Sequence, residues 1–178
     1  MFKFVMIFIL VTLGFSYFYG NPVSVIQGMV NKKDLLAVDS FFPIYFPLKA
    51  NDFKRISSSY GYRKHPVHNS FRKHKGIDLA ADSGKVVMAT GNGTVTTAAY
   101  GKKYGNYIVI DHGNDVKTTY AHLSKKLVKE GDFVYKFSNI GFVGSTGMST
   151  GPHLHYEIKI GDTHINPMLV WTKMIGKK

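Results

Sequence analysis

Short β-forming segments separated by glycine-containing turns dominate the chain from about Ile56 onward. Segments rich in Val, Ile, Thr and Tyr cover residues 86–90, 93–98, 107–111, 116–121, 133–135 and 153–160. Residue types of this kind favour strands, and their close spacing is typical of all-β domains. The pattern predicts a mainly β fold, a compact antiparallel sheet or sandwich.

Two of the intervening turns have the composition of hairpin turns. Gly91-Asn92-Gly93 and Gly113-Asn114-Asp115 contain residues that accept positive φ. The only helical piece expected within this β region is a turn near residues 124–129. The segment His74-Lys75-Gly76-Ile77-Asp78 could place His and Asp on one helix face, but Gly76 and the following apolar residues favour a loop that enters a strand.

The segment from His153 to Ile160 predicts where two histidine side chains point. Its even positions are Leu, Tyr, Ile and Ile, and its odd positions are His, His, Glu and Lys. Because strand side chains alternate between two faces, His153 and His155 share the polar face. They lie about 7 Å apart at a rise of ~3.3 Å per residue. One could bind a metal while its neighbour contacts a substrate.

The first twenty residues resemble a secretory leader. Lys3 is their only charge, and an apolar run extends from Phe4 to about Phe18. We therefore expect an N-terminal hydrophobic helix and export to the cell envelope, either periplasmic or extracellular. Since no A-x-A-like cleavage site is evident, the alternative is an uncleaved signal anchor that holds the protein to the inner membrane through residues 4–19.

The length of 178 residues suits one domain with short appendages. We expect a signal peptide or anchor over residues 1–20 and a proline-interrupted connector over 21–54. A short helix could form near residues 25–38, and the aromatic residues 41–46 should make the connector pack on the domain. The domain itself is expected over 55–170, followed by a basic tail over 171–178.

The chain carries 23 Lys and Arg against 11 Asp and Glu, a net charge of +12. This excess favours an anionic partner such as a wall polymer, a membrane face or nucleic acid. The basic residues are scattered and form no recognisable nucleic-acid motif, so we expect no nucleic-acid partner. The absence of cysteine excludes disulfides and a thiolate nucleophile, which leaves His, Asp and Glu as metal ligands.

Three histidine-containing motifs could carry chemistry. His74-x-x-x-Asp78 has ligand types that zinc prefers. His122 ends a predicted strand, and His153-x-His155 follows a stiff Gly- and Pro-containing loop. Each motif alone is weak, since the first fits a loop histidine beside a turn-capping aspartate, and a lone strand-end histidine is usually structural.

Together, these motifs resemble the lysostaphin-type, or LytM-type, zinc metallopeptidases, which have the duplicated hybrid motif fold. The resemblance covers about residues 55–166. The matching stretches, in the family's order and spacing, are SSSYGYRKHP, HKGIDLAA, VVMATGNGTV, YGNYIVIDHG, TTYAHLS, VKEGDFV, IGFVGSTGMSTGPHLHYEI and NP. It implies that His74, Asp78 and His155 bind one Zn²⁺ per chain. It also implies that His122 and His153 are the two catalytic histidines.

The chemistry of these residue types is consistent with that implication. Two histidines and one aspartate leave a coordination position open for water, the arrangement of catalytic rather than structural zinc. Metal-activated water would be the nucleophile. His122 and His153 could transfer protons and steady the oxyanion, and the sequence leaves open which of them is the base.

Several residues outside these motifs are expected to have structural or supporting roles. We expect His112 and Asp111 to hold a turn, and His164 to be exposed. Glu157 lies on the polar face of the histidine strand and could support a ligand. The family's usual glycine is replaced by Phe137. The basic stretch Phe71-Arg72-Lys73 before His74 could suit an anionic stem peptide.

The resemblance therefore predicts an exported, monomeric zinc endopeptidase that hydrolyses peptide cross-links of bacterial peptidoglycan. The first candidate bond joins D-alanine to a diamino acid, and the second lies in a glycyl bridge. The alternative is a catalytically silent wall-binding or amidase-activating module of the same fold. A nucleic-acid or anionic-membrane binder is a third, weaker hypothesis.

Overall fold

The structure, a computed structural model, describes residues 41–64 and 71–175. The expected leader, its hydrophobic helix and the short helix near residues 25–38 lie outside these ranges. Within them, no helix combines the length and the apolar character needed to cross a bilayer.

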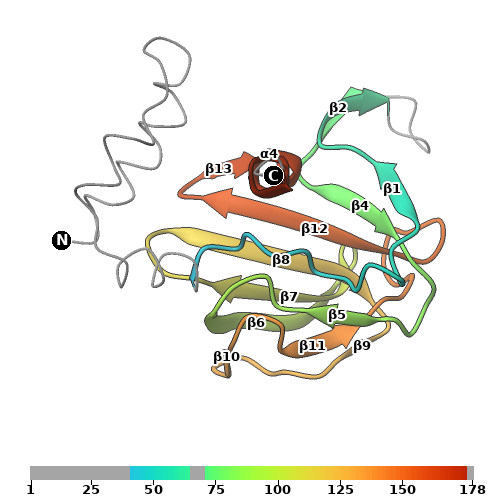
Figure 1. Ribbon diagram of the computed structural model, residues 1–178. Coiled ribbons are helices and arrows are strands. Elements are labelled where there is room, and N and C mark those ends of the chain that lie inside the picture. Colours follow the sequence, from blue (N-terminus) through green and yellow to red (C-terminus); the bar gives the residue numbers. More distant parts are fainter. Residues whose placement is uncertain (1–40, 65–70, 176–178) are drawn as a thin grey trace, which may run out of the picture. The chain divides into compact units, whose positions relative to one another are not determined.

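An eight-stranded antiparallel sheet forms the main body of the domain (Figure 1). Its strands run in the order β1-β4-β12-β8-β7-β6-β10, and β13 pairs with β12. The strands are β1 (Arg55–Ser58), β4 (Ile77–Ala80), β6 (Gly93–Gly101), β7 (Gly105–Asp111), β8 (Val116–Leu123), β10 (Phe133–Val134), β12 (His153–Ile160) and β13 (Thr163–Ile165). The predicted mainly β, antiparallel fold class is confirmed.

Two smaller sheets accompany the main one. The first consists of β5 (Val86–Met88), β11 (Asn139–Phe142) and β9 (Lys125–Lys126), and the second of β2 (Gly61–Lys64) and β3 (Phe71–His74). A single helix, α4 (Pro167–Ile175), follows β13 among the described residues. The helical turn expected near residues 124–129 is wrong, because β9 lies there and pairs with β11.

The core confirms the alternation predicted for β12. Leu154, Tyr156 and Ile158 are fully buried. The Tyr156 hydroxyl and that of Tyr120 both meet the Thr90 hydroxyl, at 2.9 and 2.8 Å. Burying these polar atoms is tolerated because each has a hydrogen-bond partner.

The two glycine turns behave differently. Gly113, Asn114 and Asp115 all have positive φ, as their composition predicts. The turn at residues 91–93 does not join a hairpin, because β5 and β6 belong to different sheets. Gly93 is instead required for space, since a Cβ there would lie 2.4 Å from the Asp111 carbonyl oxygen.

Helix α4 was not predicted, and it crosses residue 170, the expected end of the domain. Trp171 anchors it: the indole stacks on Tyr156 at a ring separation of 5.4 Å and is buried. Phe46, from the segment before β1, meets the same indole at 4.7 Å. This aromatic cluster joins both ends of the described chain to the strand that carries His153 and His155.

His112 is buried in the neutral form. Its Nδ1–H donates to the Asn92 carbonyl at 2.7 Å, so Nε2 is left to accept from the Thr118 hydroxyl at 2.8 Å. Burial lowers the pKa of His112, outweighing the opposing Asn92 hydrogen bond. Asp111 accepts from the Gly113 amide at 2.8 Å, so the expected turn role of Asp111 is confirmed.

This burial predicts an acid-sensitive contribution to stability. Below an unfolded pKa of about 6.5, the unfolded chain binds a proton at His112 that the folded chain resists, so stability falls with falling pH. His112→Asn should lower the unfolding free energy at pH 7 by about 1–3 kcal/mol. It should also reduce the loss between pH 7 and pH 5. Urea unfolding of both proteins with chelator at each pH checks this, and parallel pH curves would contradict it.

Candidate metal centre

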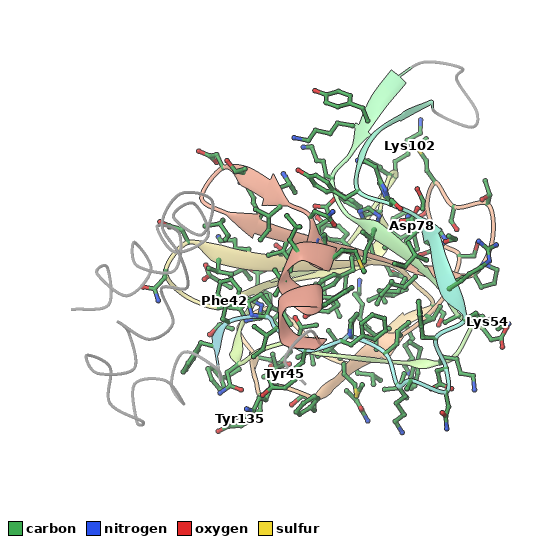
Figure 2. All side chains as sticks on the ribbon, turned by 45° about the horizontal axis from the view of Figure 1, so that its top comes forward. Phe42, Tyr45, Lys54, Asp78, Lys102 and Tyr135 are labelled. Atoms are coloured by element: carbon green, nitrogen blue, oxygen red, sulfur yellow. The ribbon has the colours of Figure 1, made fainter. Side chains whose placement is uncertain are left out.

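Strand register brings the predicted site residues together. β12 lies between β4 and β8, and His155 is directly opposite Asp78 on one side and Ala121 on the other. His122 follows Ala121, and His153 precedes His155 by two residues on the same face. Asp78 lies on β4 and is labelled in Figure 2. Backbone pairing thus brings Asp78, His155 and the end of β8 together, although they lie far apart in sequence.

The loop between His74 and Asp78 packs tightly against β12. A Cβ at Gly76 would lie 2.2 Å from the Tyr156 carbonyl oxygen. Only glycine therefore permits this approach, which carries His74 from the end of β3 toward His155. The sequence-based expectation of a loop entering a strand is confirmed.

His74, Asp78 and His155 form a compact cluster of ligand atoms that all lie within 4.8 Å of one another. His155 Nδ1 is 2.7 Å from Asp78 Oδ1, and His74 Nε2 is 3.2 Å from the same oxygen. The two histidine nitrogens are 3.0 Å apart. All three residues are buried.

The outer nitrogen of each histidine has its own partner. His74 Nδ1 donates to the Ser59 carbonyl at 2.8 Å, and His155 Nε2 donates to Glu157 Oε1 at 2.9 Å. Once deprotonated, the inner nitrogens His74 Nε2 and His155 Nδ1 can each offer a lone pair to a metal ion beside Asp78. Two imidazole nitrogens and one carboxylate oxygen are a donor set that zinc accepts with a position left open. The residues present therefore fit a catalytic metal.

Both carboxylates of the site are held ionised. Burial by itself would raise the pKa of Asp78, but hydrogen bonds from His155 and His74 outweigh it and hold that pKa below its usual range. Glu157 behaves alike: burial opposes ionisation, yet the His155 and Tyr104 hydrogen bonds bring its pKa to about 2. Anionic carboxylates at neutral pH favour binding of a cation.

Glu157 is the centre of a network beyond the ligands. The Tyr104 hydroxyl donates to Glu157 Oε1 at 2.8 Å, and His164 Nε2 donates to Oε2 at 3.1 Å. The Tyr60 hydroxyl in turn donates to the His164 carbonyl at 2.6 Å. The expectation of an exposed His164 is wrong, because β13 folds back on β12 and places it beside Glu157. Alternation within β12 correctly predicted that Glu157 shares the polar face with His155. No sequence signal pointed to Tyr104 or Tyr60.

The remaining two histidines face each other beside the cluster. The rings of His122 and His153 are 4.7 Å apart, and His153 Nε2 is 3.7 Å from Asp78 Oδ1. His122 Nδ1 donates to the Thr146 carbonyl at 2.7 Å, and His153 Nδ1 donates to the Gly151 carbonyl at 2.8 Å. In both rings Nε2 is therefore the nitrogen available to a reactant.

His122 is held in the neutral form. Burial lowers its pKa to about 4, against the opposing Thr146 hydrogen bond, so the ring is neutral at pH 7. Its backbone φ of 62° is uncommon for a residue with a side chain. Such a conformation at a candidate site is typical of a residue whose position is fixed by its surroundings.

The family model for peptidase family M23 matches residues 72–167. Among curated proteins, DD-carboxypeptidase/endopeptidase Mpg of Neisseria meningitidis is 49% identical over 118 residues, covering 66% of this chain and 27% of that protein. Peptidoglycan DD-endopeptidase ShyC of Vibrio cholerae is 42% identical over 120 residues, covering 67% and 28%. The chain thus spans about a quarter of the length of these relatives.

Solved structures share the fold. A zinc-containing peptidase from Vibrio cholerae matches with a TM-score of 0.65 and 38% identity, covering 70% of this chain and 38% of that one. The catalytic domain of the antimicrobial peptidase lysostaphin from Staphylococcus simulans matches with a TM-score of 0.61 and 32% identity, covering 67% and 92%. The match to nearly all of that catalytic domain agrees with the fold expected from the sequence.

Proposed function

This chain belongs to peptidase family M23, and from that premise we propose that it is a zinc-dependent endopeptidase that hydrolyses peptide cross-links of bacterial peptidoglycan. The observation that carries the proposal is the convergence of His74, Asp78 and His155 to within 4.8 Å. His122 and His153 lie beside them. A ligand set without adjacent proton-transfer groups would suit a structural ion equally well.

His74 Nε2, Asp78 Oδ1 and His155 Nδ1 would hold one zinc ion. When bound, zinc supplies a Lewis acid that activates water and polarises the scissile carbonyl. The protein's contribution is orientation: Ser59 and Glu157 fix the two ligand rings through their outer nitrogens, as second partners do in many metal sites. Glu157 also adds a negative charge that favours the cation.

His122 and His153 would manage protons and the oxyanion. Each anchors its Nδ1–H on a backbone carbonyl, so Nε2 of each ring can accept a proton or, once protonated, donate one. The neutral state of His122 at pH 7 suits a base, and the 4.7 Å ring separation lets a reactant contact both. Assigning base and acid requires kinetics of the two single variants.

The substrate proposal follows two of the curated relatives. ShyC is named a peptidoglycan DD-endopeptidase and Mpg a DD-carboxypeptidase/endopeptidase, which favours a D-alanyl cross-link over a glycyl bridge. Peptidoglycan lies outside the inner membrane, so the proposal includes export through residues 1–20 to the cell envelope, with or without retention as an anchor. The excess of 23 basic over 11 acidic residues suits an anionic wall polymer.

The direct test uses the purified full chain and cross-linked sacculi. Muropeptides are separated and identified by mass spectrometry, with and without a chelator. We expect cross-linked dimers to disappear as monomers with a new amino terminus accumulate, and chelation to stop this. Cross-links that persist with zinc bound would favour the silent wall-binding or amidase-activating alternative.

Gly76→Ala tests whether the His74 loop must approach β12 closely. A Cβ at this position collides with the Tyr156 backbone, so the loop should move and misplace His74. We expect zinc affinity and activity to fall at least 10-fold, in the range for disturbed support of a metal ligand. Zinc competition with a chromophoric chelator measures this. The matched control is Gly101→Ala, whose Cβ would meet the Tyr107 ring at an ordinary 3.5 Å. Equal affinities for both variants would refute the packing argument.

A further inference from the structure

Four exposed lysines lie within two residues of His74 or Tyr104, which belong to the candidate metal centre and its hydrogen-bond network. Lys73 and Lys75 flank the ligand His74, and Lys102 and Lys103 precede Tyr104. In the view of Figure 2, Lys102 lies toward the same upper part of the domain as Asp78, whereas Tyr135 lies at the opposite end.

On one side of the centre, Lys103 is joined to the site by Tyr104. The Lys103 ammonium lies 4.9 Å from the centre of the Tyr104 ring. That ring is 5.8 Å from the ring of the ligand His155, and its hydroxyl binds Glu157. The ammonium thus sits one aromatic side chain away from a metal ligand.

On the other side, Lys73 and Lys75 are joined to the site by Tyr60 and His164. The Lys73 ammonium lies 5.6 Å from the centre of the Tyr60 ring, and the Tyr60 hydroxyl binds the His164 carbonyl. Burial is the main cause that lowers the pKa of His164, and the charge of Lys75 also lowers it. Since His164 and Tyr104 both bind Glu157, both lysine pairs adjoin the same hydrogen-bond network.

These lysines lack an acidic partner, unlike several other lysines on the described surface. Lys54, Lys85, Lys117 and Lys159 form ion pairs with Asp82, Asp52, Asp111 and Asp162. Within residues 41–64 and 71–175, no ion pair involves Lys73, Lys75, Lys102 or Lys103. The carboxylates of Asp78 and Glu157 would balance a divalent cation, so the four ammonium groups remain uncompensated.

We propose that this lysine rim binds free carboxylates of the substrate's stem peptides, so that the chain selects stems with ionised carboxyl groups over stems whose carboxyl groups are amidated. The inference rests on the proposed function and specifies the substrate class of the same site. Exposed ammonium groups beside a binding site act mainly on association and orientation, and salt weakens their effect. The selectivity should therefore appear in kcat/KM and fade as ionic strength rises.

The test compares two synthetic cross-linked dimers that differ only in whether their stem carboxyl groups are free or amidated. The full chain is compared with Lys102→Gln/Lys103→Gln, which keeps side-chain length and removes two charges. We expect the wild type to favour the free-carboxylate dimer in kcat/KM by roughly 10-fold or more at low salt, and the variant to lose most of that ratio. The control Lys125→Gln/Lys126→Gln, on the short strand β9, should keep the wild-type ratio.

A binding measurement separates this inference from the proposed function. Calorimetry of the zinc-loaded full chain with uncleavable free-carboxylate and amidated stem peptides requires no turnover. If the chain cleaves neither dimer but binds the free-carboxylate peptide more tightly, through Lys102 and Lys103, the endopeptidase proposal fails and the lysine rim stands. If the wild type shows equal kcat/KM and equal binding for both forms, or the β9 control loses the ratio as well, the rim proposal is overturned.

Discussion

Asp78→Asn is expected to abolish measurable cleavage of sacculi, a fall of about 1,000-fold or more. Metal polarisation of the reacting groups is worth several kcal/mol, and each 1.36 kcal/mol corresponds to a factor of ten. Asparagine preserves the size of the side chain and one hydrogen-bonding oxygen near His155, but it removes the only anionic ligand. The substitution therefore weakens zinc binding with little change in packing. Zinc content by elemental analysis and the rate of muropeptide release are measured on the same sample.

The matched control for this prediction is Asp82→Asn. Asp82 lies in the same chain segment, but its side chain is 62% exposed and pairs with Lys54 away from the ligand cluster. Its loss should leave zinc content and rate within about twofold of wild type, because exposed ion pairs contribute little. If Asp78→Asn retains a full zinc equivalent and wild-type rates, then His74 and His155 bind metal without it and the assigned ligand set is incorrect.

His122→Ala and His153→Ala are each expected to lower kcat by about 100- to 10,000-fold, the usual contribution of a positioned general acid or base. Unlike the Asp78 variant, both should keep one zinc per chain. The reason is geometric: neither ring belongs to the ligand cluster, and each is anchored by its own backbone carbonyl, of Thr146 or Gly151. Elemental analysis and steady-state rates on a soluble cross-linked dimer separate retained metal from lost turnover.

Two outcomes would contradict this assignment. Loss of zinc together with activity would make the substituted histidine a ligand. Retention of both would make it a bystander that merely lines the site. Circular dichroism and thermal unfolding with chelator provide the folding control, since removing the buried His122 ring also leaves the Thr146 carbonyl without its donor.

Local sequence patterns predicted the strands and the direction of their side chains well. Period-2 alternation in residues 153–160 identified both the buried face, with Leu154 and Tyr156, and the polar face, with His153 and His155. Gly113-Asn114-Asp115 adopted positive φ as its composition requires. These features depend on backbone sterics and on the two faces of a strand, which are properties of adjacent residues.

Local patterns failed where distant segments decide the structure. Residues 124–129 contain a short strand because β11 offers a pairing partner, and α4 forms because Trp171 finds a stacking partner in Tyr156. The composition of residues 91–93 predicted a hairpin turn, but Gly93 is needed because it packs closely against β7.

The sequence alone determined the β class and the basic charge, through residue types and periodicity, and its resemblance to the family predicted the five candidate site residues. Tertiary structure decided what surrounds those residues. Pairing of β12 with β4 and β8 aligns His155 with Asp78, and the return of β13 brings His164 to Glu157. Tyr104 and the lysine rim also acquire their relation to the centre only through folding. Hydrogen bonding and charge compensation depend on distances in space, and spacing along the chain does not encode those distances.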